Sequence, residues 1–382
     1  MHGTAMWFDD LKASVDRVLE QFLEEQRAEL AAIGDAAATL VDEVARVVGA
    51  GGRRLRPAFC YWGHMAAEAP HSEEILRAAA SLELLHAFAL LHDDVMDRAE
   101  VRRGEPTAFR RLAEERAASR ARGDALHFGM SVAILAGDLA FALSDTLLQV
   151  SGFPLDRIWA ATRVLHDMRI RAVAGQFLDL SGAGRPLWGA GCVTEGEVRR
   201  IARLKTAAYS VEGPLLLGAT LGGADVALLA RLRAYGASIG EVLQLRDDLM
   251  SLFGDPELTG KDADADVRQG TPTLLLAEAL HRGAPDDRRT IVELWGRGNL
   301  EAAEVDAVRG AIAASGAPEA ILRLIDELVA GAVDEVRSLP QPASTALAEL
   351  AALVGRGCGV MVRAPDHSGG RAGAALNRAT RA

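Results

Sequence analysis

The spacing of apolar residues constrains the fold of this chain more than any other feature. Apolar residues recur at helical intervals almost throughout the 382 residues, and alternating strand patterns bounded by turn residues are hard to find. We therefore predict an all-α fold. The expected helices span residues 7–32, 36–48, 56–67, 72–99, 107–122, 130–150, 156–180, 194–221, 224–253, 273–281, 288–296, 300–315, 318–339 and 342–362.

The chain is expected to form one large domain. Hydrophobic residues make up 49% and charged residues 25% of the sequence, which is enough to bury a sizeable core. No proline- or glycine-rich linker divides the sequence into blocks of different composition. We predict a single domain over residues 1–362, followed by a disordered tail at 363–382.

Charge and hydropathy argue against several classes of protein. A net charge of −11 argues against a nucleic-acid-binding protein, which needs a basic surface for phosphate contacts. The sequence contains no run of about 18 uncharged apolar residues, so we expect no transmembrane helix. The N-terminus has no continuous hydrophobic signal segment. The three cysteines are far apart in the sequence, as expected of free thiols in a reducing compartment. We expect a cytoplasmic protein.

An acidic cluster, HDDVMD at residues 92–97, lies inside an otherwise apolar predicted helix. Asp93 and Asp97 are four residues apart, so their side chains project from one face about 6 Å apart along the axis. Like charges at this spacing repel, which predicts a cation between them, and oxygen ligands favour magnesium. For this cluster alone, a solvated acidic helix end remains the alternative.

Basic residues near this cluster are suited to anionic ligands. Arg102 and Arg103 follow closely and offer guanidinium forks to diphosphate oxygens. His86 falls on nearly the same helical face as Asp93 and could donate to another phosphate. The sequence GGRRLRP at residues 51–57 places three further arginines at a predicted helix N-terminus, which already favours anions. The alternatives are a core histidine and a basic surface turn.

A second acidic cluster ends another predicted helix, in the sequence QLRDDLMSLFGD at residues 244–255. Asp247 and Ser251 are four residues apart, and Lys261 follows in a predicted loop. Two acidic clusters on separate apolar helices suggest opposite walls of one cavity, where metal ions could hold a diphosphate. Helices that end in acids and glycine are common, so this cluster is the weaker signal by itself.

Together with KT at residues 205–206 and GQFLD at residues 175–179, these motifs resemble those of the trans-isoprenyl diphosphate synthases, also called polyprenyl synthetases. The resemblance runs from about Gly51 to Leu276. It implies an antiparallel helical bundle of the isoprenoid synthase type around a central apolar cavity, assembled as a homodimer. It also implies a magnesium-dependent prenyltransferase that condenses isopentenyl diphosphate with dimethylallyl, geranyl or farnesyl diphosphate.

The resemblance also implies a role for individual residues. The positions that bind isopentenyl diphosphate match Arg53, Arg56, His86 and Arg103, and a position that binds the allylic diphosphate matches Arg102. The positions that bind magnesium, with three ions expected, match Asp93, Asp94, Asp97, Asp247 and Asp248. The positions around the allylic diphosphate and the developing cation match the expected catalytic residues Lys205, Thr206 and Gln244, and also Lys261.

Three residues depart from the family's pattern. Arg53 stands where lysine is usual, which keeps the charge and changes its geometry. Ser251 replaces a third aspartate, and Thr271 replaces a common lysine. These changes bear on the third metal ion and on allylic affinity more than on the reaction type.

Phe88 and Ala89 are the expected determinants of product length, because the growing chain should extend from Asp93 back along the same helix. On a straight helix Ala89 lies most directly below Asp93, and Phe88 is rotated by about 100° from Ala89. Ala89 is too small to block the chain. An aromatic residue at the position of Phe88 resembles geranylgeranyl diphosphate synthases, so we expect geranylgeranyl diphosphate as the main product and farnesylgeranyl diphosphate as the next candidate.

Two other functions remain as alternatives. Asp247, Ser251 and Asp255 resemble, incompletely, the second metal motif of class I terpene cyclases. In a cyclase, however, the arginines expected to bind a second diphosphate would have no task. The other alternative is a non-catalytic subunit of a heteromeric prenyl synthase, and the intact acidic clusters argue against it.

Overall fold

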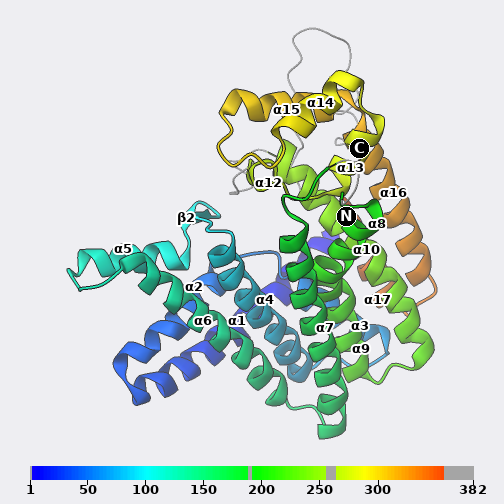
Figure 1. Ribbon diagram of the computed structural model, residues 1–382. Coiled ribbons are helices and arrows are strands. Elements are labelled where there is room, and N and C mark those ends of the chain that lie inside the picture. The colour runs from blue at the N-terminus through cyan, green and yellow to red at the C-terminus, as the bar shows by residue number, and fades with distance from the viewer. Residues whose placement is uncertain (1, 188–191, 255–263, 357–382) are drawn as a thin grey trace. The chain divides into compact units, whose positions relative to one another are not determined.

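The computed structural model describes residues 2–187, 192–254 and 264–356, and within these ranges nearly all of the secondary structure is helical (Figure 1). The predicted all-α fold is confirmed. The chain divides into two compact units: unit 1 contains Met1–Leu165 and Pro214–Leu229, and unit 2 contains His166–Gly213 and the residues from Ala230 onward. The single domain ending at residue 362 stays a prediction, because that end lies outside the described ranges.

Unit 1 is built from long helices that surround α4 (Glu73–Met96). The α4 helix packs against α1, α2, α3 and α6, and most of its side chains are buried. This central position explains why α4 is apolar on nearly every side. The other elements of unit 1 are α1 (His2–Ile33), η1 (Asp35–Ala37), α2 (Ala38–Gly49), α3 (Leu55–Ala66), α5 (Ala108–Ala118), α6 (Ala125–Gln149), the first part of α7 (Leu155–Gly182) and most of α9 (Gly213–Gly222).

A short antiparallel hairpin follows α4. Strand β1 (Val101–Arg102) pairs with β2 (Glu105–Pro106), and the two residues between them, Arg103 and Gly104, have φ angles of 55° and 80°. Positive φ at both turn residues is typical of two-residue hairpins. The sequence predicts a loop here, and the structure instead forms a hairpin with Arg103 at its tip.

Unit 2 contains the remaining described helices. The α13 helix packs against α8, α14, α15 and α16. Tyr235 of α10 donates a buried hydrogen bond of 2.7 Å to the carbonyl oxygen of Leu347 in α17. The described elements of unit 2 are the last part of α7, α8 (Glu195–Ala202), η2 (Arg203–Glu212), most of α10 (Val226–Phe253), α12 (Ala265–Gln269), α13 (Leu274–Arg282), α14 (Pro285–Leu294), α15 (Ala302–Ala314), α16 (Ala317–Val336) and α17 (Ala343–Gly355).

The segment η2 departs from the continuous helix predicted over residues 194–221. It is a π-helix of 10 residues between α8 and α9. Gly175 of α7 and Gly240 of α10 approach it so closely that a Cβ atom at either position would overlap atoms of η2. The π geometry is rare and frequently marks functional sites. In this chain it carries Lys205 and Thr206, two of the predicted catalytic residues.

Two described helices, α4 and α6, are long and apolar enough to span a membrane by length and composition. In the most apolar window of each helix, 67% of α4 but only 33% of α6 is buried. The composition of α4 is therefore explained by its place in the core. In contrast, α6 exposes several apolar side chains, among them Phe128, Ile134 and Leu135.

Candidate active site

A basic cluster lies at the N-terminus of α3 in unit 1. Arg54 directly precedes α3 with a left-handed φ of 51°, and it follows Gly51 and Gly52, which also have positive φ. This turn places the neighbouring arginines at different depths: Arg53 is exposed, Arg54 is buried and Arg56 is half-buried. Arg53 and Arg56 are therefore at least partly accessible, whereas Arg54 is enclosed by protein.

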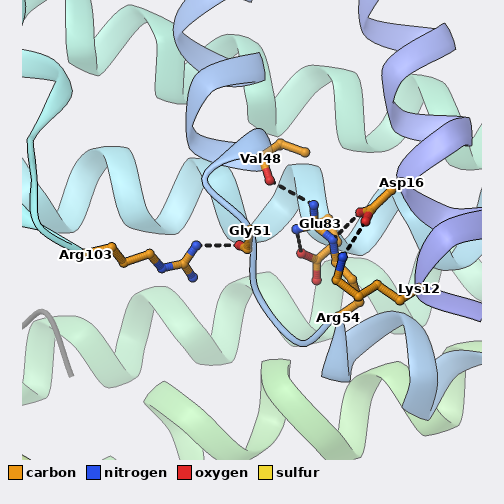
Figure 2. A network of polar contacts seen from close by, with 7 residues as sticks. All are labelled: Lys12, Asp16, Val48, Gly51, Arg54, Glu83 and Arg103. Carbon is orange, nitrogen blue, oxygen red and sulfur yellow. Dashed lines mark hydrogen bonds and ion pairs between the residues drawn. The ribbon is translucent and has the colours of Figure 1, made fainter. Parts of the chain in front are cut away.

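The tip of the hairpin meets the loop that precedes α3. Arg103 Nη1 donates a hydrogen bond to the carbonyl oxygen of Gly51 (Figure 2). A small pocket lies beside this contact, and its lining includes Gly51, Arg54, Glu83, His86 and Arg103. The structure thus brings together three segments that are distant in sequence, namely the loop, α4 and the hairpin.

His86 lies on α4 within the electrostatic reach of four arginines. Burial lowers the pKa of His86 well below its ordinary value, and Arg56, Arg103, Arg102 and Arg54 lower it further. The imidazole is consequently neutral at pH 7 and can either donate or accept a hydrogen bond. Arg54 is paired with Asp16 and Glu83, so the positive charge that could meet a diphosphate here comes from the other three guanidinium groups.

In the first acidic cluster, Asp94 is buried and Asp93 is half-buried. Arg102 of β1 places Nε 2.5 Å from Asp94 Oδ1 and Nη2 3.7 Å from Asp93 Oδ2. Burial raises the pKa of Asp94, although Arg102 opposes this change. Asp97 is the C-cap residue of α4, so the helix ends within the cluster. Arg102 thus supplies positive charge to the carboxylates that are expected to hold magnesium.

The aromatic side of α4 faces α6. The Phe88 ring centroid lies 4.8 Å from that of His92 and 4.9 Å from that of Phe141 in α6. A side chain at Gly137 would overlap the His92 ring, so the two helices approach closely at this point. Phe88 and Ala89 are both half-buried. Their role in product length stays a prediction.

In unit 2, three of the predicted site residues form one hydrogen-bonded chain. Thr206 Oγ1 donates to Gln244 Oε1, and Gln244 Nε2 donates to Asp248 Oδ1 at 2.7 Å. Lys205, next to Thr206 on η2, forms an ion pair of 2.5 Å with Asp179 of α7. The π-helix, α7 and α10 therefore bring the three predicted catalytic residues into one polar region.

Asp248 has a strongly perturbed carboxyl group. Burial raises the pKa of Asp248 to about 8, the hydrogen bond from Gln244 opposes this change, and Asp266, Asp247 and Asp179 raise the pKa further. Crowded carboxylates of this kind favour the binding of a cation, because a positive charge would relieve their repulsion.

Sequence reasoning included Asp179 in the GQFLD motif without giving it a role, and it missed Asp266 as a member of this region. Asp266 also accepts a hydrogen bond from the Ser251 hydroxyl group, so it lies beside the position where the family usually has a third aspartate. For Asp179, the GQFLD segment was a usable signal. No comparable signal distinguished Asp266 from Asp262 and Asp264, its neighbours in sequence.

Among the described residues, the predicted magnesium ligands form only part of a metal coordination shell. Within the described ranges, no group of three or more carboxylate, imidazole or thiol side chains converges closely enough to hold a metal ion. Magnesium usually takes one or two protein carboxylates and completes its coordination with water and substrate phosphates, so this oxygen-only set fits the ion. Lys261 and Asp255 lie outside the described residues.

Comparison with known sequences identifies similar proteins. The profile of the family described as polyprenyl synthetase matches residues 38–312. A short chain isoprenyl diphosphate synthase from Methanothermobacter thermautotrophicus is 31% identical over 68% of this chain and 73% of its own length. A geranylfarnesyl diphosphate synthase from Aeropyrum pernix is 34% identical over 69% of this chain and 76% of its own length.

The solved structures that resemble this chain are also those of prenyl synthases. A geranylgeranyl pyrophosphate synthase from Corynebacterium glutamicum, complexed with isoprenyl diphosphate and magnesium, is 34% identical and has a TM-score of 0.84. The match covers 91% of this chain and 99% of that one. A polyprenyl synthase from Caulobacter crescentus, complexed with calcium and isoprenyl diphosphate, is 26% identical with a TM-score of 0.74, over 92% and 96% of the two chains.

Proposed function

Because this chain belongs to the polyprenyl synthetase family of prenyltransferases, we propose that it condenses isopentenyl diphosphate with dimethylallyl, geranyl or farnesyl diphosphate and mainly produces geranylgeranyl diphosphate. The observation that carries this proposal is the charge distribution around α4. Arg56, Arg102 and Arg103 lie within electrostatic reach of the neutral His86, and the carboxylates of Asp93 and Asp94 follow on the same helix. A diphosphate needs positively charged partners such as these arginines, and a metal ion bound to the diphosphate needs ligands such as these carboxylates.

In this proposal, Asp93, Asp94, Asp97, Asp247 and Asp248 hold magnesium, with three ions bound together with the diphosphate. Bound magnesium would draw negative charge from the diphosphate as it leaves the allylic carbon. The crowding around Asp248 supports this assignment, since its raised pKa marks a place where additional negative charge is unfavourable. The similar synthase from Corynebacterium glutamicum is complexed with magnesium as well.

In the proposed reaction, the allylic carbon–oxygen bond breaks before a new carbon–carbon bond forms. The allylic carbon–oxygen bond breaks, and its electron pair leaves with the diphosphate. The double bond of isopentenyl diphosphate supplies the electron pair for the new carbon–carbon bond, and the leaving diphosphate accepts the proton that is then lost. Thr206 and Gln244 present fixed dipoles near the developing cation, and Lys205 is held by Asp179 beside them.

Isopentenyl diphosphate is assigned to Arg53, Arg56, His86 and Arg103, and the allylic diphosphate to Arg102 and Lys261. The contact between Arg103 and the Gly51 carbonyl supports the first assignment, because it brings the hairpin to the loop that carries Arg53. The ion pairs of Arg102 with the first acidic cluster support the second, because the same carboxylates would hold the metal ions of the allylic diphosphate.

Phe88 supports geranylgeranyl diphosphate as the main product. Its half-buried ring is held between His92 and Phe141, at one turn or more from the first aspartates along α4. A ring held in this way can limit the space for a growing chain. The similar proteins include synthases named for geranylfarnesyl and farnesyl products, so chain length is the part of the proposal that most needs a measurement.

We also propose a cytoplasmic homodimer. Support comes from α6, where Phe128, Ile134 and Leu135 are 37%, 41% and 54% exposed. A second copy of the chain would cover such apolar side chains. Sedimentation of the purified protein at several concentrations tests this part, and a monomer at micromolar concentration would contradict it.

The decisive experiment is incubation with isopentenyl diphosphate, magnesium and each short allylic diphosphate in turn. The dephosphorylated products are then separated by chromatography. An elongated linear alcohol of twenty carbons is the expected product. A cyclic hydrocarbon would instead indicate a terpene cyclase, and an absence of product without a partner protein would indicate a non-catalytic subunit.

A further inference from the structure

One buried guanidinium connects α1 to the loop that precedes α3. Arg54 Nε donates to Asp16 Oδ1 at 2.7 Å, and Asp16 belongs to α1 (Figure 2). Arg54 Nη1 donates to Glu83 Oε2 of α4 at 2.7 Å, and Nη2 donates to the carbonyl oxygen of Val48 at 2.8 Å. A single side chain therefore contacts α1, the last turn of α2, and α4.

Arg54 is the buried member of the three arginines in this segment, and its charge is compensated inside the protein. It is only 7% exposed and has two carboxylate partners. Although burial lowers the pKa of Arg54, Glu83 and Asp16 raise it above its ordinary value. The positive charge is thus neutralised inside the protein, so Arg54 is suited to holding the loop and not to binding an anion.

The contacts of Arg54 stabilise an unfavourable backbone conformation. Residues other than glycine rarely adopt a positive φ, and Arg54 has a φ of 51° at the start of α3. Arg53 and Arg56 lie immediately before and shortly after this point. Glu83 lies three residues before His86 on α4, so the same guanidinium also contacts the helix that carries His86.

Asp16 is itself held firmly in place. Its Oδ2 accepts a hydrogen bond of 2.8 Å from Lys12, so both carboxylate oxygens are used. The neighbouring Val15 and Leu19 are buried, and α1 packs against α2, α3 and α4. The α1 helix lies before residue 38, where the match to the polyprenyl synthetase profile begins.

We propose that Asp16 is a positioning residue for isopentenyl diphosphate, acting through Arg54 on the loop that carries Arg53 and Arg56. The inference rests on the proposed function, because that function assigns isopentenyl diphosphate to these arginines. The inference gives α1 a part in substrate binding. The Asp16 carboxylate fixes the position of Arg54, and Arg54 in turn fixes the direction in which Arg53 and Arg56 point.

The test is Asp16→Asn, which keeps the size of the side chain and removes its charge. We expect the KM for isopentenyl diphosphate to rise about 10-fold, the effect of losing about 1.4 kcal/mol. The KM for the allylic diphosphate and kcat should each stay within about twofold. Calorimetric titration of the metal-free protein with isopentenyl diphosphate alone should show the same loss of affinity without any turnover.

The matched control is Arg27→Gln. Arg27 Nε lies 2.7 Å from Asp42 Oδ1, so this pair also joins α1 to α2, but its side chains are 55% and 42% exposed and it does not include Arg54. The kinetic constants of the Arg27→Gln variant should equal those of the wild type. An equal loss of isopentenyl diphosphate affinity in Arg27→Gln would overturn the inference, because general loosening of α1 would then explain the effect.

Other outcomes decide the matter as well. An unchanged KM for isopentenyl diphosphate in Asp16→Asn overturns the inference, and so does an equal rise in both KM values. If Asp16→Asn does not fold, Arg54→Lys must show the same separation of the two KM values, since lysine keeps the charge but cannot reach three partners. Failure of the wild type to elongate any allylic substrate would instead refute the proposed function, while the calorimetric titration would still test Asp16.

Discussion

Arg102 Nε lies 2.5 Å from Asp94 Oδ1, so the side chain expected to bind the allylic diphosphate is paired with a carboxylate expected to bind magnesium. The pair is well suited to a site in which metal and diphosphate arrive together. A diphosphate oxygen can take over the guanidinium while a metal ion takes over the carboxylate. The exchange would keep both buried charges compensated.

Arg102→Gln should therefore weaken allylic binding selectively. Hydrogen bonds to charged groups contribute about 1.5–3 kcal/mol, so the KM for the allylic diphosphate should rise roughly 10- to 100-fold. The KM for isopentenyl diphosphate should change much less. Steady-state kinetics with each substrate varied separately measures both values. Arg110→Gln is the control, because Arg110 pairs only loosely with Glu100 and Glu114 at 3.7 Å.

Asp93→Ala or Asp247→Ala should abolish turnover and leave the helical fold intact, because each substitution removes a metal ligand and no core volume. Loss of several kcal/mol of charge stabilisation corresponds to a fall in kcat of at least about 1,000-fold. Product formation and far-ultraviolet circular dichroism measure the two effects. Asp286→Ala, at a side chain that is 90% exposed, should keep full activity. Near-normal turnover in either ligand variant would refute the magnesium assignment.

Phe88→Ala should lengthen the product, because it removes a ring of α4 that contacts His92 of the same helix and Phe141 of α6. We expect the main product to shift from twenty to twenty-five carbons or more, with a loss of about 2 kcal/mol in stability from the vacated volume. Chromatography of the dephosphorylated alcohols and thermal unfolding measure these effects. Phe88→Tyr, which keeps the ring, should leave the length unchanged. A Phe88→Ala product identical to that of the wild type would mean that the ring only packs the core.

The raised pKa of Asp248 predicts how the stability of the metal-free protein depends on pH. The folded state holds the Asp248 proton up to about pH 8, whereas the unfolded chain loses it near its ordinary value of 3.8. The folded state therefore binds more protons between these values, and its stability falls as pH rises through this window. Asp248→Asn should remove this part of the fall.

Thermal unfolding in the presence of a chelator, at several values between pH 5 and pH 9, tests this prediction. The variant should gain stability relative to the wild type as pH rises, and magnesium should cancel the difference by stabilising only the wild-type carboxylate. A difference between the two proteins that stays constant with pH would show that Asp248 titrates normally.

Helical periodicity predicts most of the fold because each long helix buries at least one apolar stripe. The helix predicted over residues 72–99 ends at Met96, with Asp97 as its C-cap, and a hairpin follows. The π geometry at Lys205 could not be predicted from periodicity. It coincides with the close approach of Gly175 and Gly240, which are distant in sequence.

The candidate site was predictable wherever charged residues cluster within one segment, as at residues 92–97. Sequence could not separate Arg54 from Arg53 and Arg56, because the three are of one residue type and differ in burial. Nor could it place Asp266 beside Ser251, since that contact joins α12 to α10. Spacing along one element is visible in a sequence, whereas contacts between elements require the folded chain.

The π-helix also limits how this protein can be engineered. Deleting one residue from η2 would favour regular α geometry. Residues on the two sides of the deletion would then turn by about 100° relative to each other. The Lys205–Asp179 ion pair and the Thr206–Gln244 hydrogen bond would no longer share one orientation. A variant shortened in this way would keep a helix here and misalign the side chains that η2 now presents.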